Sequence, residues 1–588
     1  MPEDSRQEEE KGTGEARYLL AAALLVGAPV PYLFAMAVLG GSLWDGFDVF
    51  WRWSLFFFWY WAPLGLFLFR KPLRIGWRLL AAYLASVPLY AVCLWAIYPM
   101  AGGSFRPFRA GIWPIYLSAT PTFFLCVACL YFICRSRRWL AELTGWLACI
   151  VFLAGISVPF AIWNRTDRYK WPRGDNARLA IVNARIVNLG KEPPSGELVD
   201  GKAVLVEGGK IARVVPLAQV GPDWPRFDAA GAYLLPGLID VHAHLFAPIR
   251  SVETGFDYGY MLNCFFSGYA PHRKEYLENG ITAIRDDGGP AIRAFALRAA
   301  IANHRLLGPR LFAVGRLVTA PRGHPVATIW KAFPALVRDG AIVADSQRSL
   351  VRSLEKNYRE GPPDAVKFIY GTIGLAPERL SPEFLRAGIA WSAEHHLISV
   401  VHAETTDEVS LAISDGATGV EHVASIDTLP ESLLDLIRRR RPFLDPTFGE
   451  YETALKLRHV DEAGRAELLR QKYGFVRQIY QAGGVLVIGT DAPLVAYGAG
   501  LHDEFKHFRE ASFSPAEILT FDTINNSAYL GAADHLGRIE AGYDADIILV
   551  RKNPLLDLST LRAPAWVFRD GILVVHPEKK LSQNSNAN

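Results

Sequence analysis

His242 and His244 are separated by one residue in the segment Pro-Gly-Leu-Ile-Asp-Val-His-Ala-His that begins at Pro236. On a β-strand, side chains two residues apart point the same way and lie roughly 7 Å apart, so both imidazoles can reach one small cation. A chain with fourteen histidines produces such a pair by chance, however. The significance of the pair therefore depends on the residues downstream.

Four further residues with metal-binding side chains lie within or just after strand-like apolar runs. Lys367 interrupts one run, His402 and His422 each follow one, and Asp491 closes another. An aspartate in that place can hold a metal and can accept a proton from metal-bound water. Glu421, next to His422, is a candidate for a supporting hydrogen bond to the site. Together with the His-x-His pair, these residues predict a metal centre.

Lys367 is the least expected member of this set. An ammonium group inside an apolar run is costly to bury and repels a cation. A carbamate formed with carbon dioxide would reverse its charge and give an anionic group able to bridge two metal ions. The alternative is a lysine at the mouth of the site with no metal role.

The segment 236–533 alternates strand-like runs with helical stretches, which is typical of repeated β/α units and a parallel sheet. The pattern predicts a closed barrel of eight strands, with the metal-binding residues gathered at the C-terminal ends of the strands. The predicted strands are Leu238–Val241, Ile281–Ile284, Leu311–Val314, Ala365–Ile369, Ile398–Val401, Thr418–Val420, Pro442–Leu444 and Val485–Ile488.

Short alternating strands flank this middle segment on both sides. They occupy 178–235 before it and 534–576 after it, with glycine and proline between them. Two such segments around a long insertion predict one small β-sandwich built from both ends. The fold class expected for residues 178–576 is therefore α/β, a (β/α)8 TIM-like barrel with a composite β-sandwich.

The first third of the chain has a different composition. After a polar tail at 1–16, apolar runs of about 20 residues, each long enough to cross a bilayer, fill 17–163 and predict about five transmembrane helices. A re-entrant second segment is an open alternative. The predicted spans are Tyr18–Leu39, Val49–Phe69, Leu79–Met100, Ile112–Cys134 and Gly145–Trp163. Residues 164–177 are expected to be a linker, and 577–588 a flexible tail.

Basic residues predict the orientation of these spans. They are dense in the N-terminal tail and in the second and fourth loops, which the positive-inside rule puts in the cytoplasm. With five spans, everything after Trp163 then lies on the extracytoplasmic, periplasmic side. The lipid bilayer is one expected partner, whereas a net charge of +3 gives no reason to expect nucleic acid.

Beyond the His-x-His segment, several linked motifs occur in order, and together they resemble the metal-dependent amidohydrolase superfamily. The similarity is greatest to its imidazolonepropionase-like and Xaa-Pro dipeptidase-like branch, and it spans nearly all of 178–575. The motifs are Gly280–Asp286, Gly308–Arg310, Gly489–Ala492 and Leu536–Gly542 running into Ala545–Ile547. The first third of the chain lies outside the resemblance.

The resemblance implies a centre of two divalent metal ions, commonly zinc. His242 and His244 would bind the more buried ion, and His402 and His422 the more exposed one. Lys367 would be the carboxylated bridging lysine. Asp491 would bind the buried ion and carry the proton.

The expected reaction is hydrolysis of a non-ester C–N bond, in an amide, peptide or cyclic amide, by attack of a metal-bridging hydroxide. His324 and Tyr370 are candidates to bind the small-molecule or short-peptide substrate. A mononuclear zinc deaminase of the same superfamily is one alternative, for which Lys367 is not needed. A catalytically silent, ligand-sensing barrel coupled to the membrane domain is the other.

Overall fold

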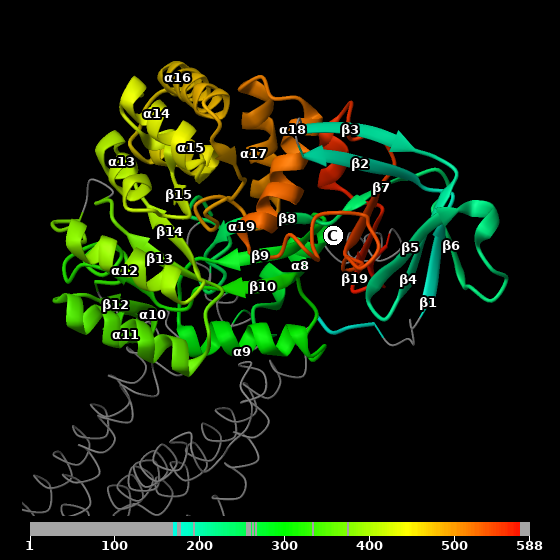
Figure 1. Ribbon diagram of the computed structural model, residues 1–588, viewed down its shortest axis with the longest axis horizontal. Coiled ribbons are helices and arrows are strands. Elements are labelled where there is room, and N and C mark those ends of the chain that lie inside the picture. Colours follow the sequence, from blue (N-terminus) through cyan, green and yellow to red (C-terminus); the bar gives the residue numbers. More distant parts are fainter. Residues whose placement is uncertain are drawn as a thin grey trace, which may run out of the picture. The chain divides into compact units, whose positions relative to one another are not determined.

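The computed structural model describes residues 169–576, apart from 173–177, 192–193, 248, 255–259, 261–263, 265–266, 332–333 and 373–375 (Figure 1). The chain divides into two compact units, Met1–Thr166 and Asp167–Asn588, and the described residues belong to the second. The predicted transmembrane helices and both predicted tails lie outside the described residues. Within the described part of the chain, no helix is long and apolar enough to cross a bilayer.

Two antiparallel-rich sheets form a sandwich beside the barrel, and one of them uses both ends of this unit. In Figure 1 the red C-terminal strands lie next to strands from the N-terminal side. The four-stranded sheet has the order β5-β4-β1-β6: β1 (Arg178–Val182), β4 (Lys202–Glu207), β5 (Lys210–Pro216) and β6 (Arg226–Asp228). The six-stranded sheet has the order β20-β19-β18-β7-β2-β3: β2 (Arg185–Lys191), β3 (Pro194–Val199), β7 (Tyr233–Pro236), β18 (Ile547–Val550), β19 (Trp566–Arg569) and β20 (Ile572–Val575).

The two sheets are held together by apolar side chains from both ends of the sequence. Ile181 and Val204 of the first sheet pack in one buried cluster with Leu234, Ile547 and Phe568 of the second. Burying these side chains removes apolar surface from water, which is the main source of their stabilisation. The composite sandwich is therefore held by contacts that span more than 300 residues of sequence.

The barrel consists of parallel strands at the eight places where the sequence predicts them. They are β8 (Leu238–Ala243), β9 (Ile281–Asp286), β10 (Arg310–Ala313), β13 (Ala365–Ile369), β14 (Ile398–His402), β15 (Gly419–Glu421), β16 (Phe443–Asp445) and β17 (Val485–Leu486). Every residue of β8, β9 and β13 is buried, as expected for parallel strands covered by helices on one face and filled by side chains on the other.

Barrel closure differs from a regular ladder at two places: β10 and β13 belong to separate sheets, and the last strand is paired over only part of its predicted length. The predicted strand Val485–Ile488 pairs regularly only over β17, and the residues after it run beside β8. There, buried side chains replace strand partners: Asn526 accepts from the Ile488 amide at 2.9 Å, and Asp240 accepts from the Thr490 amide at 3.1 Å. Because the backbone there is not held in a regular ladder, the chain can turn at Asp491, toward the end of the barrel where the predicted metal ligands lie.

Helices on the outside of the barrel connect its strands (Figure 1). Helix α13 shows how the sequence starts one: the Thr405 hydroxyl accepts from the Glu408 amide, and the Glu408 carboxylate accepts from the Thr405 amide. The helices are α8 (Ala270–Glu278), α9 (Ala291–Ala302), α10 (Pro334–Gly340), α11 (Gln347–Glu360), α12 (Pro382–Glu394), α13 (Thr406–Ser414), α14 (Glu431–Arg440), α15 (Phe448–Leu457), α16 (Glu462–Gln481), α17 (Ala499–Glu510), α18 (Pro515–Thr520) and α19 (Asn526–Tyr529).

Two features of this unit are absent from the sequence-based prediction. Strands β11 (Leu317–Thr319) and β12 (Ala341–Val343) pair with each other and extend the sheet at β13; three residues are too few to show a periodic pattern. Part of the expected linker also packs on the barrel. Tyr169 is buried, and the Trp171 indole donates to the Leu306 carbonyl at 2.9 Å.

Candidate active site

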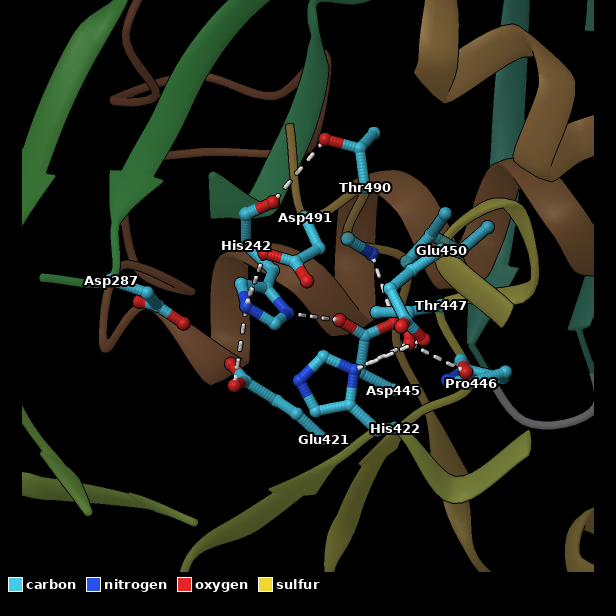
Figure 2. Close-up of polar contacts among 12 residues, drawn as sticks. His242, Asp287, Glu421, His422, Asp445, Pro446, Thr447, Glu450, Thr490 and Asp491 are labelled. Atoms are coloured by element: carbon cyan, nitrogen blue, oxygen red, sulfur yellow. Dashed lines mark hydrogen bonds and ion pairs between the residues drawn. The ribbon is translucent and has the colours of Figure 1, made fainter. Parts of the chain in front are cut away.

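The six residues predicted to bind metal converge at the C-terminal end of the barrel. His242 lies in β8, Lys367 in β13 and His402 at the end of β14, while His244, His422 and Asp491 each follow a strand. The ring centroids of His242 and His422 are 5.0 Å apart, and those of His402 and His422 are 4.3 Å apart. In Figure 2, His242, His422 and Asp491 surround one small space.

Hydrogen bonds on the outer side of two imidazoles direct their inner nitrogens to this space. The His422 Nδ1 lies 2.9 Å from the Thr447 hydroxyl, and the His244 Nδ1 lies 3.3 Å from the Gly288 carbonyl oxygen. A neutral ring that donates from Nδ1 keeps a lone pair on Nε2, which is the form that binds metal. His422 can take this form, whereas the Nε2 of His244 lies 3.1 Å from the Asp491 carboxylate and pairs with it.

Burial keeps most of these imidazoles neutral. It lowers the pKa of His422 to about 4, and it lowers the pKa of His242 well below its ordinary value, with a further contribution from the Lys367 charge. For His244, burial also opposes the charge, but the Asp491 carboxylate outweighs it and raises the pKa. A neutral imidazole is the form that binds a cation, so His242 and His422 are ready to do so at neutral pH.

An unpartnered nitrogen tests whether the residues fit a metal. The Nε2 atom of His402 is buried and has no hydrogen-bond partner among the described residues; its neighbour, the Glu404 carboxylate, is 3.6 Å away. A buried polar atom of this kind is costly unless something binds it. His242, His422 and Asp491 also offer ligand atoms that all lie within 4.8 Å of one another. The donor set therefore fits a divalent cation.

Asp491 lies where it can serve two imidazoles. Its Oδ1 is 3.1 Å from His244 Nε2 and 3.5 Å from His242 Nε2. Burial favours the neutral acid, but the hydrogen bond from His244 and the nearby positive charges lower the pKa of this carboxyl. The group is therefore ionised and can bind a cation or accept a proton.

Lys367 reaches the same space from β13. Its Nζ lies 3.5 Å from His242 Nε2 and 3.6 Å from Asp287 Oδ2, and it forms an ion pair with the Glu421 carboxylate. The side chain is 1% exposed, and burial lowers the pKa of its amine to about 8. A neutral amine is the form that reacts with carbon dioxide, so a lowered pKa favours the carbamate.

Several acidic residues of the site were not among the predicted ligands. Glu421, Asp445 and His242 form a second buried group able to hold a cation, and Asp287 and Glu450 lie beside it (Figure 2). The sequence signal for Glu421 was its place next to His422. Asp445 ends the strand β16 and was detectable by the same rule that selected the histidines. Burial raises the pKa values of Asp445 and Glu450 to about 8.

The two candidate substrate-binding residues both lie beside His402. His324, in the loop after β11, stacks on His402 with ring centroids 6.1 Å apart, and its Nδ1 lies 2.7 Å from the Thr328 hydroxyl. Tyr370 follows β13, is 2% exposed, and its ring lies 5.3 Å from the Arg379 guanidinium. His324 is thus next to a predicted metal ligand, whereas Tyr370 is largely enclosed.

Comparison with known proteins gives this fold and site a family. Residues 233–574 match the model of the amidohydrolase family. The ochratoxinase of Aspergillus niger is 23% identical over 445 residues, which cover 67% of this chain and 85% of the relative. The imidazolonepropionase of Thermoplasma volcanium is 21% identical over 435 residues, which cover 68% of this chain and 99% of the relative.

The solved structures agree with this assignment at the level of the fold. The crystal structure of a Xaa-Pro dipeptidase with bound methionine superposes with a TM-score of 0.57 at 22% identity, covering 67% of this chain and 99% of that chain. The first third of the chain is outside the family match. The chain belongs to the amidohydrolase family and is a hydrolase that acts on carbon–nitrogen bonds.

Proposed function

We propose that this chain is a membrane-anchored hydrolase with two divalent metal ions, commonly zinc, that cleaves an amide or peptide bond in a small molecule or short peptide. The observation that carries the proposal is the convergence of four imidazoles and Asp491 around the buried amine of Lys367. A carbamate on Lys367 would give this set the anionic bridge that two cations need.

Bound metal ions would act as Lewis acids toward a carbonyl group and would bring the pKa of water near neutrality. His242 and His244 would hold one ion, and His402 and His422 the other. Asp491, ionised and turned toward His242 and His244, would accept a proton and pass it to the leaving nitrogen. His324 and Tyr370 would contact the substrate next to His402.

The substrate proposed first is a dipeptide or N-acyl amino acid, and a cyclic amide comes second. A dipeptidase is among the similar structures and an imidazolonepropionase is among the relatives, so both classes are represented. A panel of dipeptides, N-acyl amino acids and lactams, assayed with the purified full-length protein, distinguishes them by kcat/KM. If the protein hydrolysed none of these compounds, the proposal would be contradicted.

Metal content tests the binuclear centre. The wild-type protein should contain two ions per chain and show a carbamate signal after exposure to ¹³C-labelled carbon dioxide. The Lys367→Ala variant should bind one ion instead of two and show no carbamate signal, because the bridging group is gone. Its kcat/KM should be lower by about 100-fold or more. Lys472→Ala is the matched control, since Lys472 of α16 is also buried but donates to the backbone carbonyl of Ile426.

A mononuclear deaminase is the second candidate, and one observation favours it. Lys367 is paired with Glu421 and lies close to Asp287, as an ammonium group without a metal role would be. One ion per chain, no carbamate signal and full activity of Lys367→Ala would favour this candidate over the binuclear hydrolase.

For the location of the enzyme, we propose about five membrane spans within 17–163 and a catalytic unit on the extracytoplasmic side. The support is the series of apolar runs and the distribution of lysine and arginine between the loops. A reporter active only in the periplasm, fused after Val575, should be active. An active cytoplasmic reporter at the same position would overturn the topology.

A further inference from the structure

A buried arginine joins two carboxylates that no step of the proposed reaction uses. Arg285, in β9, is 1% exposed and belongs to a motif that the reaction leaves unexplained. Its Nη2 donates to Glu421 Oε1 at 2.8 Å and to Asp287 Oδ2 at 3.0 Å, and its Nε also donates to Asp287. The ring of Tyr529 lies 4.4 Å from the guanidinium. Arg285 is therefore held in one position.

The same two carboxylates face Lys367. The Oε2 atom of Glu421 pairs with Lys367 and lies 3.5 Å from His242 Nε2, and Asp287 Oδ2 lies 3.6 Å from the lysine Nζ. Figure 2 shows Glu421 extending toward His242, with Asp287 to one side. Both carboxylates are thus shared between Arg285 and Lys367, and they lie directly beside the metal centre.

Two buried carboxylates need compensating positive charge. Among the described lysine and arginine side chains, Arg285 and Lys367 are those with nitrogen atoms within 4.0 Å of either carboxylate. A guanidinium presents five donors in a planar fork and binds two carboxylates at once, whereas an ammonium group is a single point charge. Arg285 is therefore suited to satisfy both carboxylates, and a lysine in its place is not.

We propose that Arg285 is a positioning residue of the metal centre: it holds Glu421 and Asp287 and supplies the positive charge that they still need once Lys367 has become the carbamate. This inference rests on the binuclear function proposed above. In the step concerned, the lysine ammonium group first loses one proton to water. The neutral nitrogen then forms a bond to the carbon of carbon dioxide as one C=O π bond opens onto its oxygen, and a second proton passes from nitrogen to water, which leaves the anionic carbamate. Without Arg285, the two carboxylates retain Lys367 as their counter-ion.

The test compares Arg285→Lys with Arg569→Lys in the full-length protein. Arg569 is a matched control because it is also 1% exposed and pairs with Asp546 at 3.2 Å and Asp570 at 2.7 Å, in the sandwich. Arg285→Lys should reduce the metal content from two ions to one, abolish the ¹³C carbamate signal and lower kcat/KM by about 100-fold or more. Arg569→Lys should keep both ions and the signal.

A second variant separates positioning from a merely structural role. Glu421→Gln removes the competing charge, so the double variant Arg285→Lys/Glu421→Gln should recover the ion and the carbamate signal that the single arginine variant loses. Two ions and an intact carbamate in Arg285→Lys would overturn the inference. It would also fail if the double variant recovered neither.

The two proposals can fail separately. If the wild-type protein binds one ion, the binuclear function is wrong, and the inference is then judged on that single site loaded with Co²⁺. A changed absorption spectrum and at least a tenfold weaker Kd in Arg285→Lys, but not in Arg569→Lys, would support a positioning role. An unchanged spectrum and Kd would overturn it.

Discussion

Asp491 is the residue on which proton transfer depends in the proposed reaction. Its carboxylate contacts both histidines of the His-x-His pair, and its backbone amide donates to the His242 carbonyl at 2.8 Å. The backbone has a φ of 55°, a left-handed conformation that aspartate and asparagine adopt more easily than most residues. An asparagine substitution therefore changes the charge with little change in shape.

Asp491→Asn should lower kcat by about 100-fold to 10,000-fold, because an amide cannot accept the proton that a carboxylate accepts. Steady-state kinetics together with metal content check this expectation. Asp534→Asn, at an exposed site next to His535, should leave both unchanged. A kcat for Asp491→Asn within a few-fold of the wild type would show that another group moves the proton.

At the scale of elements, the junction between β8 and the segment after β17 fixes the position of His242 relative to Asp491. Asp240 of β8 accepts from the His242 amide at 3.1 Å, and from the Thr490 amide at 3.1 Å and hydroxyl at 2.7 Å. The Asp240 carboxylate thus accepts hydrogen bonds both from His242 and from Thr490, the residue before Asp491. Barrel closure and site geometry depend on the same contacts.

Thr490→Val should destabilise the protein by about 1–3 kcal/mol, because it leaves a buried oxygen of Asp240 without its hydroxyl donor. Denaturant unfolding of the metal-free protein measures this change, and a metal titration should show weaker binding. Thr490→Ser keeps the hydroxyl and should recover most of both losses. If Thr490→Val were as stable as Thr490→Ser, the hydroxyl bond would not be holding the junction.

For the catalytic unit as a whole, ion pairs connect the barrel to the sandwich. Arg310 of β10 pairs with Asp546 at 2.8 Å and Asp544 at 3.0 Å, and it also pairs with Asp570. Arg569 joins the same acidic group from β19. Since both parts contribute to this network, we expect barrel and sandwich to unfold together.

His272 makes the stability of this unit dependent on pH. Its ring stacks on Tyr497 with centroids 3.8 Å apart, its Nδ1 lies 2.9 Å from the Leu245 carbonyl oxygen, and burial lowers its pKa to about 3. An unfolded histidine binds a proton below about pH 6.5. The stability that the folded protein gains by keeping His272 neutral is therefore fully present above pH 6.5 and is lost as the pH falls toward about 3.

His272→Gln should remove this dependence. Between pH 7.0 and 5.5, the free energy of unfolding of the metal-free wild type should fall by about 1 kcal/mol more than that of the variant. Urea unfolding at the two pH values measures the difference. Equal falls in both proteins would mean that His272 is not held neutral in the folded state.

The sequence alone determined the barrel strands and the six candidate metal ligands. Parallel barrel strands are buried along their length, so they appear as apolar runs, and a polar residue at the end of such a run stands out. His402 and His422 were found in this way. The sequence also located the composite sandwich, because short alternating strands recur on both sides of the barrel.

Only the tertiary structure decided what surrounds those ligands. Arg285, near the end of β9, meets Glu421 of β15, 136 residues away in sequence. Glu421 and Asp287 in turn pair with Lys367 of β13. No periodic pattern links such positions, because their contact depends on strand order and on which side chains point into the barrel. The physical reason is that burial forces opposite charges to pair across the closed barrel, and that pairing exists only once the chain has folded.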